Sequence, residues 1–187
     1  MASQITPGQC PPEGCPPPTE IACIVVDKVY DSCFQVDERT RTTTVTIGAG
    51  NEWPTGVFTV GDLVQCEMTE GLDITCTEIS RVPAGEGFVT VTIMVNLPIT
   101  LTNPEDEEET VNRVFSFTKT ATLCCPEGVE PDCTESTLLF CNCVITQVED
   151  DEVEVTCEFS VCVVIKCILT VQLLVPSYGF CVPAPCT

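Results

Sequence analysis

Hydrophobic and polar side chains alternate along most of this chain, which is the period of a β-strand and not that of a helix. In Phe88–Val95, every second position from Val89 onward is apolar, and Thr90 and Thr92 lie on the opposite face. The same alternation predicts strands over seven further segments: Thr42–Ile47, Leu63–Met68, Leu72–Ile79, Val111–Leu123, Thr137–Val148, Glu152–Val161 and Val163–Val175.

Turn-forming or acidic residues separate most of these segments, at Gly48–Asn51, Glu70–Gly71, Pro83–Gly85 and Glu149–Asp151. Thr, Val and Ile supply 62 of the 187 residues, and their β-branched side chains favour strands. No window shows sustained helical periodicity. We therefore predict an all-β protein, either a β-sandwich or two packed antiparallel sheets, with about eight to ten strands.

Proline and cysteine are concentrated at both ends of the chain. Residues 7–18 read Pro-Gly-Gln-Cys-Pro-Pro-Glu-Gly-Cys-Pro-Pro-Pro, and the last seven residues read Cys-Val-Pro-Ala-Pro-Cys-Thr. Proline excludes a helix interior and disfavours a central strand. We expect extended Pro/Cys-rich arms at residues 1–20 and 177–187.

The β-rich body between the arms is expected to span residues 21–176. The order Cys66…Cys76 followed by a long apolar strand resembles Cys143…Cys157 followed by another. The body is therefore either one unit or two similar subdomains, at about 21–123 and 134–176.

The chain is strongly acidic, with 7 Lys and Arg against 28 Asp and Glu, a net charge of −21. Such a surface repels phosphate, which excludes binding to nucleic acid or anionic lipid. The most apolar stretch, Val161–Val175, is interrupted by Lys166 and is too short to span a membrane. Residues 1–7 have neither the basic nor the apolar region of a signal peptide, so none is expected.

Histidine is absent, which excludes Ser-His-Asp and Cys-His catalysis and every histidine-ligated zinc site. With one Trp and two Tyr there is also little aromatic surface for sugar stacking. We expect that the protein is not an enzyme. The acidic runs Pro104–Glu109 and Glu149–Glu152 are interpreted as solvated turns. The alternative for these runs is loose Ca²⁺ binding, although no EF-hand-like ligand spacing is present.

Metal ligation, redox catalysis and disulfide bonding are three competing uses for the 16 cysteines. No Cys-x-x-Cys motif occurs, which argues against a metal knuckle and against a thioredoxin-like site. Disulfides are therefore favoured, and no cofactor is expected. Because β-strand side chains alternate, Cys157 and Cys167 face one way and Cys162 the other. The adjacent Cys124 and Cys125 should take separate partners.

The arm cysteines have two interpretations: each pair closes a loop in its own arm, or the arms reach neighbouring subunits and are cross-linked there. The candidates for disulfides between chains are Cys10, Cys15, Cys124, Cys125, Cys181 and Cys186. The candidates for disulfides within the chain, or for burial, are Cys23, Cys33, Cys66, Cys76, Cys133, Cys141, Cys143, Cys157, Cys162 and Cys167.

Two stretches resemble a known family. Cys23–Cys33 (CIVVDKVYDSC) and Val171–Cys181 (VQLLVPSYGFC) are similar to cysteine-rich proteins of spore-forming Gram-positive bacteria that carry the SPOCS domain, named for spore-coat proteins. The resemblance covers roughly residues 20 to 180. It implies a β-rich module that works in assembly or on the spore or cell surface, and synthesis in the mother cell, which would explain the missing signal peptide.

The cysteine load and the Pro-Cys arms depart from the usual pattern of that family. They resemble endospore appendage subunits, whose cysteine-bearing N-terminal arms join neighbours in a fibre. Only this logic carries over, onto Cys10 and Cys15.

The sequence thus favours a structural subunit of a self-assembling, disulfide-cross-linked extracellular filament or spore or cell-surface layer. Its partners would be further copies of itself, with other surface or coat proteins as additional partners. One alternative is a monomeric, disulfide-stapled binding or adaptor module in spore coat assembly. Another is a protein that sequesters metal through its thiolates.

Overall fold

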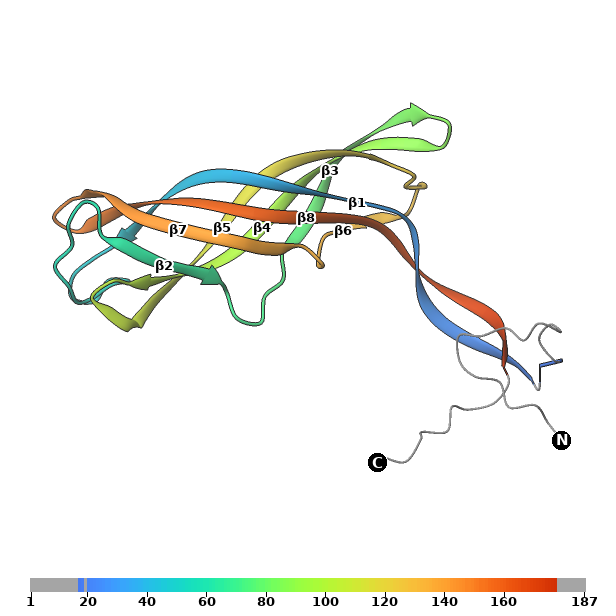
Figure 1. Ribbon diagram of the computed structural model, residues 1–187, viewed down its shortest axis with the longest axis horizontal. Helices are drawn as coiled ribbons and strands as arrows, with labels where there is room; N and C mark the ends of the chain where they lie inside the picture. The colour runs from blue at the N-terminus through green and yellow to red at the C-terminus, as the bar shows by residue number, and fades with distance from the viewer. Residues whose placement is uncertain (1–16, 19, 178–187) are drawn as a thin grey trace. The chain divides into compact units, whose positions relative to one another are not determined.

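The computed structural model describes residues 17, 18 and 20–177 (Figure 1). These residues contain no helix, and so none that could cross a membrane. They form eight β-strands: β1 (Glu20–Thr46), β2 (Leu63–Met68), β3 (Thr75–Gly85), β4 (Phe88–Asn103), β5 (Asp106–Leu123), β6 (Glu130–Asp132), β7 (Thr137–Val148) and β8 (Glu152–Ser177).

The chain divides into two units, and β1 and β8 each contribute to both. The larger unit, residues 29–169, is called the body below. The smaller unit consists of residues 1–28 and 170–187, of which the structure describes 17, 18, 20–28 and 170–177. In the smaller unit, the described ends of β1 and β8 form a two-stranded antiparallel ribbon, and the Thr170 hydroxyl donates a hydrogen bond to the Asp27 carboxylate at 2.6 Å.

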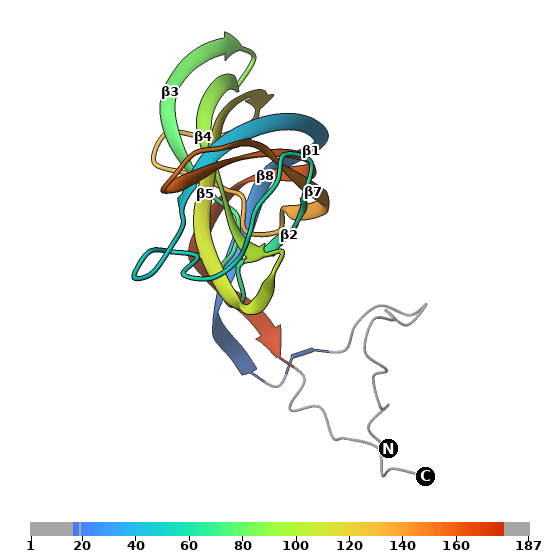
Figure 2. The ribbon, with the colours of Figure 1, turned by 90° about the vertical axis from the view of Figure 1, so that its left-hand side faces the viewer.

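The body is one antiparallel sheet that folds over into two layers. In the first layer, called the β4 layer, β5 runs along one side of β4, and β2 and β3 follow one another along the other side. In the second, called the β8 layer, β1 runs along one side of β8, and β7 and β6 lie along the other. Figure 2, seen along the strands, shows β4 and β5 on one side of the body and β7 on the other.

Strand β2 connects the two layers. Its first residues, Leu63 and Val64, pair with Val144 and Cys143 of β7, and its remaining residues pair with β4. The hydrogen-bonded ladder is therefore continuous, although the apolar faces of the two layers are turned toward each other.

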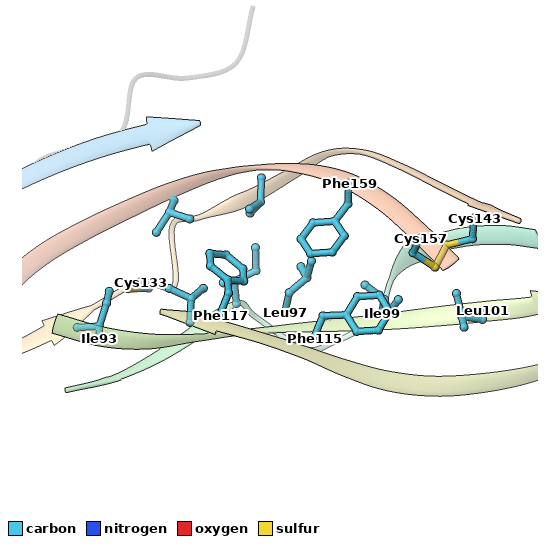
Figure 3. Packing of buried hydrophobic residues seen from close by; sticks show 14 of the residues in the cluster. Ile93, Leu97, Ile99, Leu101, Phe115, Phe117, Cys133, Cys143, Cys157 and Phe159 are labelled. Carbon is cyan, nitrogen blue, oxygen red and sulfur yellow. A yellow bond between two sulfur atoms is a disulfide. The ribbon is translucent and has the colours of Figure 1, made fainter. Parts of the chain in front are cut away.

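The core lies between the layers because each strand presents its apolar face inward. Six alternate residues of β4, from Val91 to Leu101, are fully buried. From the opposite layer, Phe159 of β8 packs against Phe115 and Phe117 of β5, with ring centroids 5.6 and 6.4 Å apart (Figure 3). Aromatic pairs at such distances stabilise a core beyond the area that they bury.

Short turns set the register of two hairpins of the β4 layer. β3 and β4 are joined by Glu86 and Gly87, both with positive φ, the conformation of a tight hairpin turn that matches strand twist. β4 and β5 are joined by Pro104 and Glu105, whose flanking residues Asn103 and Asp106 are paired. Proline presets the φ angle that the first turn position requires.

The predicted fold class is confirmed: the described chain is all-β, with two packed antiparallel layers and eight strands. Several boundaries differ from the expectation. β8 runs unbroken through Cys162, where two strands were predicted, because its inward and outward alternation continues past that residue. β1 begins at Glu20, far before the predicted start at Thr42, and β3 is shifted to Thr75–Gly85. The predicted arms lie mostly outside the described residues.

Candidate cross-linking site

Four disulfides join strands of the body. Cys66 of β2 is bonded to Cys141 of β7, and Cys76 of β3 is bonded to Cys133, the residue that follows β6. Both bonds therefore connect the β4 layer to the β8 layer. Because a disulfide removes conformations from the unfolded chain, each bond stabilises the folded body. The four bonds are Cys66–Cys141, Cys76–Cys133, Cys125–Cys167 and Cys143–Cys157.

The expectation that Cys125 forms a disulfide between chains is wrong, because Cys125 is bonded within the chain to Cys167. Its side chain is fully buried beneath β8, and the Arg81 guanidinium binds its carbonyl oxygen at 3.0 Å. A sulfur in this position cannot reach another chain. The adjacent Cys124 has no disulfide partner among the described residues, so the prediction of a separate partner for each neighbour is met only for Cys125.

Four cysteines in the described part of the chain have no disulfide partner there: Cys23, Cys33, Cys124 and Cys162. Cys23 is exposed, so the expectation that it is buried is wrong, and its expected disulfide does not lie within the described chain. The other three are partly exposed. The remaining interchain candidates lie outside the described residues: Cys10, Cys15, Cys181 and Cys186.

Asp31 interacts with two of these cysteines, through the backbone of Cys124 and the thiol of Cys33. Its carboxylate accepts a hydrogen bond from the backbone N–H of Cys124 at 2.9 Å. Burial, and secondly the negative charge of Asp31, raise the pKa of the Cys33 thiol above its usual value of 9.0. Cys33 is therefore protonated at neutral pH and is a slow nucleophile, because the thiolate is the reactive form.

Exposed apolar side chains also lie on three neighbouring strands of the β8 layer. The name outer patch is used below for four residues of these strands: Phe34 and Val36 of β1, Phe140 of β7 and Cys162 of β8. Phe34 is 74% exposed, and Val36 and Phe140 are about half exposed. Cys162 lies between two buried valines of β8 and so points outward, as the alternation predicted. The patch thus combines exposed apolar area with a thiol that has no disulfide partner in the described chain.

The two-stranded ribbon, residues 20–28 and 170–177, is a second apolar surface and is called the terminal ribbon below. Ile21, Val25 and Leu174 are 62%, 66% and 75% exposed, and Cys23 lies on the same ribbon. An isolated pair of strands is marginally stable in water, and clustered exposed apolar side chains mark an interaction surface.

Basic side chains are bound to groups within the chain. Lys119 of β5 and Asp37 of β1 form a buried ion pair at 2.5 Å across the two layers. Arg39 also contacts Asp37, and its guanidinium lies 5.4 Å from the centre of the Phe117 ring. The other ion pairs are Arg81–Glu78, Arg113–Glu52 and Lys166–Glu135.

This use of the cations leaves most carboxylates without a positive partner. The Arg113 hydrogen bond lowers the pKa of Glu52 below its usual value. Yet 28 acidic residues share only seven basic ones, so the surface is strongly negative. Within the described residues no three carboxylates converge as a ready-made cation site. The acidic turns therefore offer no preformed place for calcium there.

One group of possible metal ligands does exist in the described chain. The sulfurs of Cys66, Cys141, Cys143 and Cys157 all lie within 4.8 Å of one another. They belong to two of the disulfides, Cys66–Cys141 and Cys143–Cys157. No motif in the sequence indicates this group, because ligand spacing along the chain reveals only knuckles made by neighbouring residues.

A comparison of the chain with protein-family models, curated proteins and solved structures finds no match. The functional interpretation therefore depends on the residues and their geometry.

Proposed function

We propose that this protein is a structural subunit of a self-assembling filament or surface layer whose subunits are cross-linked by disulfides, and that it is not an enzyme. Four disulfides within one body are typical of an extracellular protein, since reducing compartments keep thiols unbonded. The finer proposal is carried by one observation: the terminal ribbon exposes apolar side chains on the same unit that holds the cysteine-rich ends of the chain.

The cysteine inventory supports cross-linking. Eight of the 16 cysteines form the four body disulfides. The other eight comprise four without a partner in the described chain and the four in the predicted arms. In an oxidising environment these eight cysteines are available to form disulfides between copies of the chain.

The two apolar surfaces supply the non-covalent part of the proposed assembly. Burying a Val, Leu or Ile side chain that water otherwise contacts stabilises by about 1.5–3 kcal/mol. Ile21, Val25 and Leu174 of the terminal ribbon, together with Phe34 of the outer patch, are each more than half exposed in a single copy. A neighbouring copy that covered them would gain several such contributions.

Electrostatic repulsion opposes this association. Each copy carries a net charge of −21, and basic residues that could bridge neighbours are few. Apolar contacts and disulfides do not require basic residues, so they can hold copies together where ion pairs between copies could not. The resemblance to SPOCS-domain proteins and to endospore appendage subunits, stated above on Cys23–Cys33, Val171–Cys181 and the arms, supports a spore or cell-surface location.

A monomeric adaptor module is the second candidate function. It is favoured by the four disulfides, which stabilise the body without any contribution from another chain. In that case the eight remaining cysteines would pair within one chain, and the exposed apolar surfaces would bind a different coat protein.

The deciding experiment assembles the protein from a mixture of isotopically light and heavy chains and maps the disulfides by non-reducing mass spectrometry. Cross-linked peptides that join light to heavy chains would support the polymer. If every bond stays within one isotope population, covalent assembly is wrong. The polymer should also survive boiling in detergent and dissolve when reductant is added.

A variant and a matched control identify the cysteines involved. We expect Cys10→Ser with Cys15→Ser to weaken assembly and leave the body folded. Cys76→Ser with Cys133→Ser removes the same number of thiols from a bond that lies within the body. This control should lower stability and keep the cross-links between chains. A double arm variant that cannot fold would show that Cys10 and Cys15 are bonded within the chain.

A further inference from the structure

Four sulfurs gather where the two layers of the body meet. Cys66 lies on β2, Cys141 and Cys143 on β7, and Cys157 on β8, and all four sulfurs lie within 4.8 Å of one another. This group is called the four-sulfur cluster below. It is located at the point where β2 leaves β7 to pair with β4. Neither of the other two disulfides has a third potential ligand from the described residues within this range.

Strand geometry places the four side chains. Cys141 and Cys143 are two residues apart on β7 and therefore share its inner face. Cys143 is directly opposite Cys157 in the β7–β8 ladder, and Val64 of β2 pairs with Cys143 on the other side. Cys143 and Cys157 are fully buried, and Cys66 and Cys141 pack against the same core. The cluster is thus held by paired backbone on three strands and not by loops.

The spacing fits one tetrahedral ion. Thiolate sulfurs lie about 2.3 Å from Zn²⁺, so two sulfurs on a regular tetrahedron are separated by about 3.8 Å. The sulfurs of Cys141 and Cys143, which belong to different disulfides, are 3.8 Å apart. Tetrahedral coordination by four sulfurs is diagnostic of zinc or of an iron–sulfur cluster. The small span of this group favours a single ion, because a cluster separates its cysteines more widely.

We propose that the reduced chain binds one Zn²⁺ at Cys66, Cys141, Cys143 and Cys157, and that oxidation of these residues to their two disulfides expels the ion. Metal and disulfides are thus alternative states of one site. Binding converts four thiols to thiolates and releases four protons. Oxidation of the four cysteines to two disulfides needs an oxidant, and a small disulfide such as oxidised glutathione suffices.

The exchange balances as follows. Two molecules of the small disulfide each accept two electrons and, with four protons, become four small thiols. The four cysteine thiolates lose those electrons and form the Cys66–Cys141 and Cys143–Cys157 bonds. Zn²⁺ leaves with its charge unchanged. The ion would hold β2, β7 and β8 together before oxidation, and would keep four of the 16 thiols from incorrect pairing.

The test uses the full-length chain, reduced and kept free of oxygen, with Zn²⁺ as the probe. One equivalent of Zn²⁺ is added, the thiols are alkylated for a short time, and labelling of each cysteine is measured by mass spectrometry. We expect slower labelling of the four cluster cysteines and unchanged labelling of the others. Protection that is spread evenly, or that falls on other cysteines, would overturn the proposal, as would a reduced chain that takes up no zinc.

Two matched variants locate the site independently. Cys66→Ser with Cys157→Ser removes one ligand from each disulfide of the cluster, and Cys76→Ser with Cys133→Ser removes two thiols elsewhere. In competition with a chromophoric chelator, the control should retain one tightly bound Zn²⁺ per chain and the cluster variant should lose it. Equal retention by both contradicts the proposal. Titration of the wild-type chain with oxidised glutathione should release the zinc as the two bonds form. All these measurements use unassembled chains, so their failure would leave the proposed polymer unaffected.

Discussion

Two of the disulfides are nested, and this makes their contributions to stability interdependent. Cys76 and Cys133 lie between Cys66 and Cys141 along the chain. When the Cys66–Cys141 bond is removed, residues 66 and 141 are still connected by a short path that runs along the chain and through the Cys76–Cys133 bond. This path has ten residues from Cys66 to Cys76 and eight from Cys133 to Cys141. The unfolded chain therefore gains less freedom than the full separation of 75 residues would suggest.

The magnitude follows from loop-closure entropy. A loop of 75 residues corresponds to about 4.5 kcal/mol, and one of 18 residues to about 3.2 kcal/mol. Removing either nested bond alone should therefore lower the free energy of unfolding by about 3 kcal/mol. The reason is that the remaining bond shortens the loop that the removed bond had closed. Removing both should cost about 7.5 kcal/mol, which exceeds the sum of the single losses by about 1.5 kcal/mol.

The assay is guanidinium unfolding without reductant of Cys66→Ala with Cys141→Ala, of Cys76→Ala with Cys133→Ala, and of all four together. Equal losses from the two pairs, and a larger than additive loss from the combination, are expected. The reasoning is refuted if either pair alone costs more than about 4 kcal/mol, in line with its own loop of 75 or 57 residues, or if the losses simply add. The size of each single loss discriminates even when the fourfold variant does not fold.

Three further outcomes can be measured by the same unfolding assay. Lys119→Met should destabilise by less than the roughly 3–5 kcal/mol of a fully unpaired buried charge, because Arg39 still contacts Asp37, whereas Lys119→Met with Asp37→Leu should recover part of that loss. Phe159→Ala should cost about 3–5 kcal/mol, since the ring is buried between the layers, and a loss below 1 kcal/mol would contradict this packing. The pKa of Glu52 is lowered by its bond to Arg113, so its ionised form stabilises the fold above about pH 4.5 and this contribution is lost as the pH falls through the folded-state pKa. Glu52→Gln should therefore destabilise at neutral pH and have little effect in strong acid.

The fold class could be predicted because period-two alternation is a local property of the chain. The Phe88–Val95 pattern reports directly which face of β4 is buried, and the same rule placed Cys162 opposite to Cys157 and Cys167. The beginning of β1 was not predicted. Many residues of β1 before Thr42 are exposed on both faces of the strand, so buried and exposed positions do not alternate clearly there.

The cysteine partners could not be predicted, because they depend on contacts between residues that are distant along the chain. Cys76 and Cys133 are 57 positions apart, and only the packing of the two layers brings them together. Cys125 was misplaced for the same reason, since its burial depends on the part of β8 around Cys167, which lies 42 positions later. The Asp37–Lys119 pair, separated by 82 positions, gave no local signal either.

The distribution of the basic residues has a consequence for digestion of the protein. All seven Lys and Arg lie within strands β1, β3, β5 and β8, and no turn or chain end contains one. Proteases cut where the backbone can separate from its hydrogen-bonded neighbours, which is chiefly at exposed turns. Trypsin-like enzymes would thus find their recognition residues only in paired backbone. Glutamate-specific enzymes would find theirs in the acidic turns, so the lifetime of the folded protein among secreted proteases should depend on the class of protease that it meets.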